Sequence, residues 1–160
     1  MKNEILRILA KNSRTSNEQI ALMLGKQVEE VIQAISELEE KNIIMGYPAT
    51  VNWEKTDREA VMAFIEVRVT PQRDKGFDKV AERIYQYPQV KSCNLMSGGY
   101  DLFVAVEGKT MKEVALFVAE KLATIESVIS TATHFVLKQY KENGVIYEQK
   151  YKDNREAVVL

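Results

Sequence analysis

The sequence contains almost none of the residues that build disulfides, metal centres and histidine-based active sites. Its 160 residues include one cysteine, Cys93, and one histidine, His134. One cysteine cannot form an internal disulfide, and the two residues together are too few for a zinc or iron–sulfur site. We therefore expect no metal, no cofactor and no enzymatic activity. Cys93 is expected to pack as a small hydrophobic residue in a strand, and His134 to have a structural or interface role.

Motifs for nucleotide binding and hydrolysis are also missing. None of the patterns GxGxxG, GxxxxGK[ST], HExxH and GxSxG occurs in the chain, so the corresponding chemistry has no anchor in the sequence. No run approaches the ~18 apolar residues of a membrane-spanning helix, and charges interrupt residues 1–14 before a signal-peptide core could form. We expect a soluble, cytoplasmic protein with no membrane partner.

The composition is that of a folded globular protein. Hydrophobic residues make up 46% of the chain and charged residues 28%, which argues against disordered, collagen-like and coiled-coil proteins. The 22 lysines and arginines nearly balance the 23 aspartates and glutamates, so the formal net charge is -1. A chain of this length has room for one or two small domains.

The first 45 residues carry three short helical patterns. Residues 16–19 form a capping box for the second helix, and Gly25 is suited to end it with a positive φ. Three short helices with a tight glycine turn predict a helix-turn-helix domain. Apolar residues at helical spacing are expected to face inward: they are Ile5, Leu6, Ile8, Leu9, Ile20, Ala21, Leu24, Val28, Val31, Ile32, Ile35 and Leu38.

Two strand–helix–strand patterns follow in residues 61–138, joined by a hairpin at Gly98-Gly99. Their matching order predicts a ferredoxin-like βαββαβ domain, with two helices on one face of an antiparallel sheet. The fold class is therefore α+β. In the helix over 110–122 we expect the inward residues to be Met111, Val114, Ala115, Val118 and Leu122. The other sheet face is expected to carry Met62, Phe64, Tyr100, Leu102 and Val104 or their neighbours.

That second face is too apolar to stay in contact with water, so we expect a partner subunit or the C-terminal tail to cover it. Between the two domains, residues 43–52 have the composition of an extended arm, and Tyr47 and Trp53 are expected to hold this arm against a neighbour. We divide the chain into a helix-turn-helix domain at 1–45, an arm at 46–58, a second domain at 59–140 and a tail at 141–160. The tail is expected to add an edge strand, to cross to a partner, or to be disordered beyond Lys152.

In the order and spacing of several short stretches, nearly the whole chain resembles the Lrp/AsnC family, the leucine-responsive and feast/famine regulators. The stretches are Arg14-Thr15-Ser16, Leu24-Gly25, residues 38–47, residues 97–101, and residues 131–133 with Lys138. The resemblance implies a winged-helix-like DNA-binding domain joined by an arm to a domain that senses an amino acid or related metabolite. It also implies dimers, formed through the sensing sheets, that assemble into tetramers or octamers.

The resemblance further implies an effector site between subunits, shaped by Gly98, Tyr100 and Asp101, with Thr131 and Thr133 close by. Backbone amides at a glycine hairpin can meet a ligand carboxylate, and Asp101 can pair with an α-ammonium group. The alternative is that the glycines form only a turn, that Asp101 satisfies local backbone amides, and that the threonines are simple strand formers.

Binding of double-stranded DNA is expected from cations that neutralise phosphates and from glutamines that read adenine edges. The candidate residues are Lys2, Arg7, Lys11, Arg14, Lys26, Gln27 and Gln33. Against this, the third helix is acidic, because Lys26 and Lys41 enclose five glutamates: Glu29, Glu30, Glu37, Glu39 and Glu40. The leading hypothesis is a metabolite-responsive transcriptional regulator. The alternative is a ligand-binding or assembly module whose degenerate helix-turn-helix binds DNA weakly or not at all.

Overall fold

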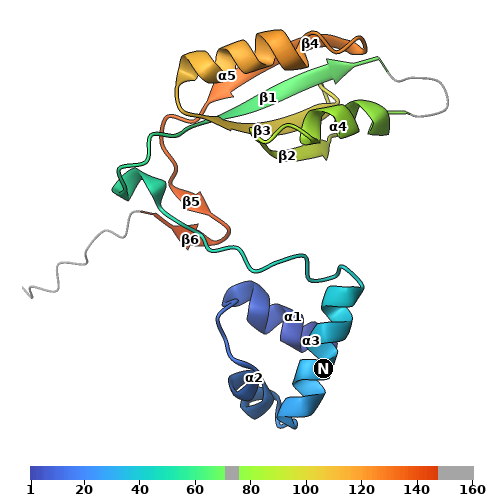
Figure 1. The fold of residues 1–160 in the computed structure, drawn as a ribbon, viewed down its shortest axis with the longest axis vertical. Coiled ribbons are helices and arrows are strands. Elements are labelled where there is room, and N and C mark those ends of the chain that lie inside the picture. Colours follow the sequence, from blue (N-terminus) through green and yellow to red (C-terminus); the bar gives the residue numbers. More distant parts are fainter. Residues whose placement is uncertain (71–75, 148–160) are drawn as a thin grey trace, which may run out of the picture. The chain divides into compact units, whose positions relative to one another are not determined.

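The computed structural model describes residues 1–70 and 76–147. The chain divides into two compact units, Met1–Val51 and Asn52–Leu160, and each is described by itself (Figure 1). The boundary between the units, after Val51, falls inside the predicted arm. The finer boundaries at 45, 58 and 140 stay a prediction. In the described part of the chain, no helix has the length and apolarity to cross a membrane.

The first unit is the expected set of three helices. They are α1 (Lys2–Lys11), α2 (Asn17–Leu24) and α3 (Val28–Glu40). The capping box is present at the start of α2, where the Ser16 hydroxyl accepts from the Gln19 amide and the Gln19 side chain accepts from the Ser16 amide. Gly25 ends α2 in the left-handed region with φ +61°, which a residue without a Cβ adopts at little cost.

The core of the first unit differs from the predicted set in α3. Val31, Ala34 and Leu38 are buried, whereas Ile32, which we expected to face inward, is 48% exposed. The three buried residues follow one another at spacings of three and four, so they share a single stripe of the helix. Ile32 is about 100° away from Val31 around the axis, and it lines a surface groove with Leu9 and Tyr47.

The second unit contains the predicted βαββαβ order, which confirms the fold class. Its four-stranded antiparallel sheet has the order β2-β3-β1-β4. The elements are β1 (Val61–Val69), α4 (Asp78–Tyr85), β2 (Val90–Leu95), β3 (Leu102–Gly108), α5 (Met111–Phe117) and β4 (Val128–Phe135). A 3-10 turn at Trp53–Lys55 precedes them, and α5 continues as a π-helical turn over Val118–Leu122.

Helices α4 and α5 cover one face of this sheet (Figure 1), and the core lies between them and the strands. Alternate residues of β1, namely Ala63, Ile65, Val67 and Val69, are buried there as the period-two pattern predicts. In α5 the expectation was wrong for Met111 and Ala115, which are exposed. Phe117 is buried instead, because its ring packs edge-on against Tyr87 at 5.3 Å.

The opposite face of the sheet, called here the open face, carries aromatic and charged side chains. The register places Leu102 and Val104 on the helix side, beside Val67 and Ile65. Phe64 and Phe103 therefore lie on the open face, where their rings stack at 5.1 Å and 9°. These two half-buried rings are the apolar centre of that face.

The described part of the tail does not extend the main sheet. Strands β5 (Lys141–Glu142) and β6 (Val145–Ile146) pair with each other in a separate two-stranded sheet. These residues therefore form a local hairpin in place of the predicted edge strand, because the short Asn143-Gly144 turn favours pairing between neighbouring segments. The disorder predicted beyond Lys152 lies outside the described residues.

Candidate functional site

Six of the seven predicted DNA contacts are exposed in the first unit, and Lys2 is half-buried. Glu4 connects two of them electrostatically. Its pKa is lowered chiefly by the hydrogen bond and charge of the N-terminal ammonium, at 3.0 Å, and also by Arg7 and Lys26. The charges of Arg7 on α1 and Lys26 in the α2–α3 turn therefore act on the same carboxylate.

Glu37 joins two more of the candidates. The Lys2 ammonium donates to Glu37 Oε2 at 2.5 Å, and Gln33 Nε2 donates to Glu37 Oε1 at 3.4 Å. Hydrogen bonding and charge from Lys2 hold the pKa of Glu37 below its ordinary value. Among the described residues, no hydrogen bond or ion pair links the side chains of Lys11 and Arg14 to this group.

Three other glutamates of α3 also accept hydrogen bonds, although from uncharged donors. Glu30 accepts from the Gln27 amide at 3.0 Å, which caps the helix, and its charge also suits the positive end of the helix dipole. Glu39 accepts from the Tyr47 hydroxyl at 2.7 Å, and Glu40 from Ser36 at 3.4 Å. Burial and the Glu39 bond raise the pKa of Tyr47 to about 12. Counting charges along the sequence could not find these contacts, because several partners lie outside α3.

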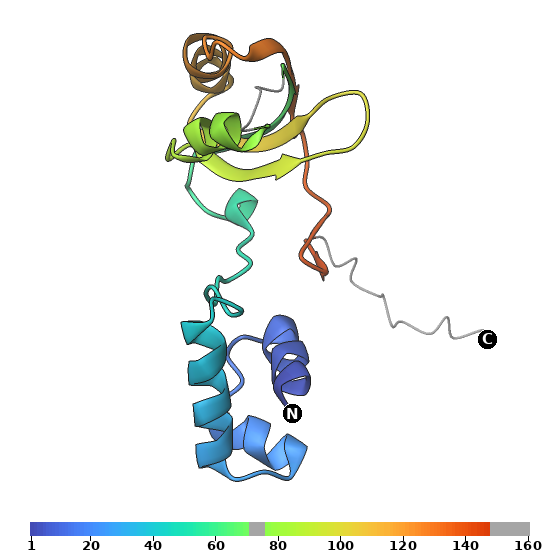
Figure 2. The same cartoon turned by 90° about the vertical axis from the view of Figure 1, so that its right-hand side faces the viewer.

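In the second unit, the predicted effector residues Gly98, Tyr100 and Asp101 lie in the loop between β2 and β3. Figure 2 shows this loop extending beyond the ends of both strands. The Met96 amide donates to the Asp101 carbonyl at 2.8 Å and closes the loop, while Gly98 takes a positive φ of 136°. The Tyr100 ring leans against Phe103 at 5.9 Å, on the side of the open face.

Asp101 fastens this loop to the end of β1. Its Oδ2 accepts from the Val69 amide at 2.7 Å, and its own amide donates to the Val67 carbonyl at 3.0 Å. The contact lies where the β1–β4 register shifts between Arg68 and Val69. One carboxylate oxygen is therefore engaged by backbone, as the structural alternative for Asp101 predicts.

The two threonines lie on the other side of the sheet. Thr131 pairs with Val67 and Thr133 with Ile65, so both are on the helix-covered face and half-buried. Tyr100 leans toward the open face. Within one chain, the five predicted effector residues therefore lie on both faces of the sheet and are not gathered on one surface.

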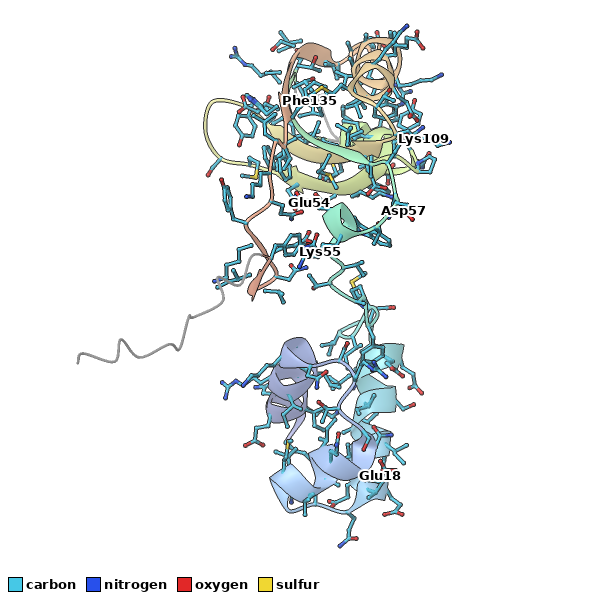
Figure 3. All side chains as sticks on the ribbon, turned by 90° about the vertical axis from the view of Figure 1, so that its left-hand side faces the viewer. Glu18, Glu54, Lys55, Asp57, Lys109 and Phe135 are labelled. Carbon is cyan, nitrogen blue, oxygen red and sulfur yellow. The ribbon has the colours of Figure 1, made fainter. Side chains whose placement is uncertain are left out.

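Sequence reasoning missed a charge cluster that holds residues 53–58 against β3. Arg58 Nη2 donates to Glu107 Oε1 at 2.6 Å, and the Lys91 ammonium lies 3.5 Å from the same oxygen. The Arg58 guanidinium also stacks over Trp53, 4.3 Å from the ring centroid. The labelled Glu54 and Asp57 mark this segment in Figure 3. Trp53 thus holds the segment in place through Arg58.

On the open face, His134 Nε2 lies 3.3 Å from Glu66 Oε1. His134 is exposed and pairs with Phe64 in the β1–β4 register. Across residues 1–70 and 76–147, no three histidine, cysteine, aspartate or glutamate side chains are arranged to hold a metal ion.

Comparison with protein families divides the chain in the same way as its two units. Residues 2–45 match the family model for a winged helix-turn-helix DNA-binding domain. Residues 62–146 match the model for the Lrp/AsnC ligand-binding domain. The second match alone covers more than half of the chain.

Individual proteins agree with these matches. The chain is 49% identical over 158 residues to YugG, an uncharacterised helix-turn-helix transcriptional regulator of Bacillus subtilis, covering 98% of this chain and 95% of that protein. It is 30% identical to the Bkd operon transcriptional regulator of Pseudomonas aeruginosa, covering 84% and 88% of the two chains.

Solved structures share the fold at low sequence identity. A transcriptional regulator of Neisseria meningitidis in complex with L-methionine superposes with a TM-score of 0.71 at 24% identity, covering 88% of this chain and 90% of that one. The leucine response regulatory protein of Mycobacterium tuberculosis gives 0.74 at 20% identity, covering 89% and 94%.

Proposed function

The chain belongs to the Lrp/AsnC family of transcriptional regulators, and from this premise we propose that it binds DNA under the control of an amino acid or a related small metabolite. The family assignment confirms the resemblance read from the sequence. Members of this family are transcriptional regulators and not enzymes, which confirms the expectation that the chain has no enzymatic activity.

The observation that carries the proposal is the presence of both modules in one chain. A capped helix-turn-helix precedes a domain that matches the family's ligand-binding module. The helix-turn-helix has its own core, formed by Ile5, Leu9, Ile20, Ala21, Val31 and Ala34. The exposed Arg7, Lys11, Arg14 and Lys26 supply cations for phosphates. On α3 itself, the Lys2 ammonium offsets the charge of Glu37.

Support for an amino-acid effector comes from the β2–β3 loop and from a structural relative. The loop exposes glycine backbone and contains the Asp101 carboxylate, two features suited to the carboxylate and the ammonium of an amino acid. The Neisseria meningitidis structure contains L-methionine. We infer an amino acid or close derivative as the effector class for this chain, bound near Gly98, Tyr100 and Asp101.

We further propose a homodimer that assembles into tetramers or octamers, located in the cytoplasm, where a regulator reaches its DNA. The open face supports this, because the stacked Phe64 and Phe103 rings on it would gain by burial against a second copy. In such an assembly the β2–β3 loop, whose Tyr100 leans toward the open face, lies near the contact between subunits. Ligand and DNA would then bias the same assembly equilibrium.

The test is binding of the full chain to a labelled duplex from upstream of its own coding region. Affinity is measured across a salt series against a scrambled duplex of equal length, with and without a mixture of amino acids. We expect binding at low salt that weakens steeply as salt rises, and a specific-to-scrambled ratio that the amino acids change.

Two results would overturn the proposal at different points. Folded, assembled protein that shifts no duplex at any salt would reject DNA regulation and favour a ligand-binding module with a degenerate helix-turn-helix. Binding whose ratio no amino acid alters would keep DNA binding but reject the effector class.

A further inference from the structure

Glu37 occupies a central place among the predicted DNA contacts, although it carries the wrong charge for DNA. Its two carboxylate oxygens are shared between Lys2 of α1 and Gln33, one turn earlier in α3. The side chain of Glu37 is 37% exposed and that of Lys2 is 43% exposed, so both can be reached from solvent. Glu37 thus connects a phosphate-binding candidate with a base-reading candidate.

We propose that Glu37 is a positioning residue that sets sequence preference, by orienting the Gln33 amide toward adenine and by holding Lys2 back from phosphates. This inference rests on the proposed DNA-binding function. It assigns the role to Glu37 itself, which lies outside the set of residues predicted to touch DNA.

The first part follows from the hydrogen-bonding capacity of a glutamine. Gln33 donates one Nε2 hydrogen to Glu37, which leaves the other hydrogen and the carbonyl oxygen available. That donor–acceptor pair is what the N7 and N6 edge of adenine requires. An exposed glutamine otherwise samples many rotamers, and the contact between positions i and i+4 restricts them before DNA arrives.

The second part follows from charge. An exposed ion pair is weak and is screened by salt, so a phosphate can compete with Glu37 for Lys2. The negative charge of the Glu37 carboxylate also repels the phosphates of the DNA backbone. Both effects lower affinity for any duplex equally, whereas the Gln33 contact favours one base pair. Glu37 therefore lowers the affinity for every duplex and raises the preference for one sequence.

Two substitutions separate these effects. Glu37→Gln keeps an acceptor for Gln33 but removes the charge that holds Lys2. Glu37→Met has a similar size and no strong acceptor for either partner. Glu40→Gln is the matched control, because Glu40 is also an α3 glutamate but contacts Ser36 and not a predicted DNA contact. Thermal melting by circular dichroism establishes that every variant is folded.

Affinities of the full-length variants are measured for the upstream duplex and its scrambled counterpart across salt. Glu37→Gln should bind both duplexes several-fold more tightly, with a salt slope steeper by about 1, because Lys2 gains a phosphate. Glu37→Met should also lower the specific-to-scrambled ratio by about two-fold, the value of a contact between positions i and i+4 that orients the glutamine beforehand. Gln33→Ala should lower the ratio by roughly ten-fold, because it removes the base contact itself, and in that background Glu37→Met should leave the ratio unchanged.

An unchanged ratio in Glu37→Met, or equal effects of Glu37→Gln and Glu40→Gln, would overturn the inference while DNA binding stands. If the unaltered chain binds no duplex, the proposed function fails first and the inference fails with it. The contact between Lys2 and Glu37 can be tested without DNA. In an NMR titration Glu37 should have a pKa below its ordinary value, and Lys2→Ala should raise that pKa.

Discussion

Replacing Asp101 should destabilise the second unit by an amount set by one hydrogen bond. In Asp101→Ala the Val69 amide loses its carboxylate acceptor at 2.7 Å, and Val69 is only 3% exposed, so water replaces that acceptor poorly. Hydrogen bonds to charged groups contribute about 1.5–3 kcal/mol. Because Asp101 itself is half-buried, we expect a loss of about 1–2 kcal/mol.

Asp101→Asn should cost less, because its amide oxygen can still accept from Val69. The loss is then the difference between a charged and a neutral acceptor, about 1 kcal/mol or less. The same substitution removes the charge proposed to pair with an effector ammonium. Asp101→Asn should therefore lose amino-acid binding while the fold stays nearly intact, which separates the structural role from the binding role.

Urea unfolding of the full chain, followed by Trp53 fluorescence, measures this effect. Trp53 is the one tryptophan of the sequence and lies in the second unit, so its signal reports that unit. The midpoint should fall with an unchanged slope. Hydrogen exchange at the Val69 amide should accelerate in Asp101→Ala. Unchanged unfolding and unchanged exchange at Val69 would refute the reasoning.

Two further predictions concern Gly25 and Cys93. Gly25→Ala should lower the free energy of unfolding of the first unit by about 1–2 kcal/mol, measured by far-UV circular dichroism. A Cβ at this position meets no atom within 4 Å, so the loss comes from backbone strain at φ +61°. A loss well below that of Gly25→Asn would contradict this explanation. Burial raises the pKa of the Cys93 thiol, so alkylation at pH 8 should be slower in the folded protein than in urea and should accelerate toward higher pH; equal rates in the two states would contradict this.

Features that depend on neighbouring residues were predictable from the sequence. The capping box of Ser16 and Gln19, the glycine that ends α2, and the alternation in β1 each involve residues a few positions apart, and each is present. Such signals are local, so one sequence contains all the information that they need.

Features that depend on distant partners were not predictable. Ile32, Met111 and Ala115 were placed inward because a periodic pattern gives the direction of a buried stripe only approximately. Lys2–Glu37, Val69–Asp101 and Arg58–Glu107 join residues 35, 32 and 49 positions apart. A sequence without relatives aligned to it contains no record of those pairs.

The π-helical turn that ends α5 gives this part of the chain tolerance to a change in length. At Val118–Leu122 the Ala123 amide donates to the Val118 carbonyl, five residues back, at 2.8 Å. A π turn holds one residue more than an α turn. Deleting one residue there would convert the turn to ordinary α-helix while Val114 and Phe117 keep their places in the core. A deletion of one residue at this turn is therefore expected to leave the register of β4 unchanged, which measures how much slack the connection between α5 and β4 contains.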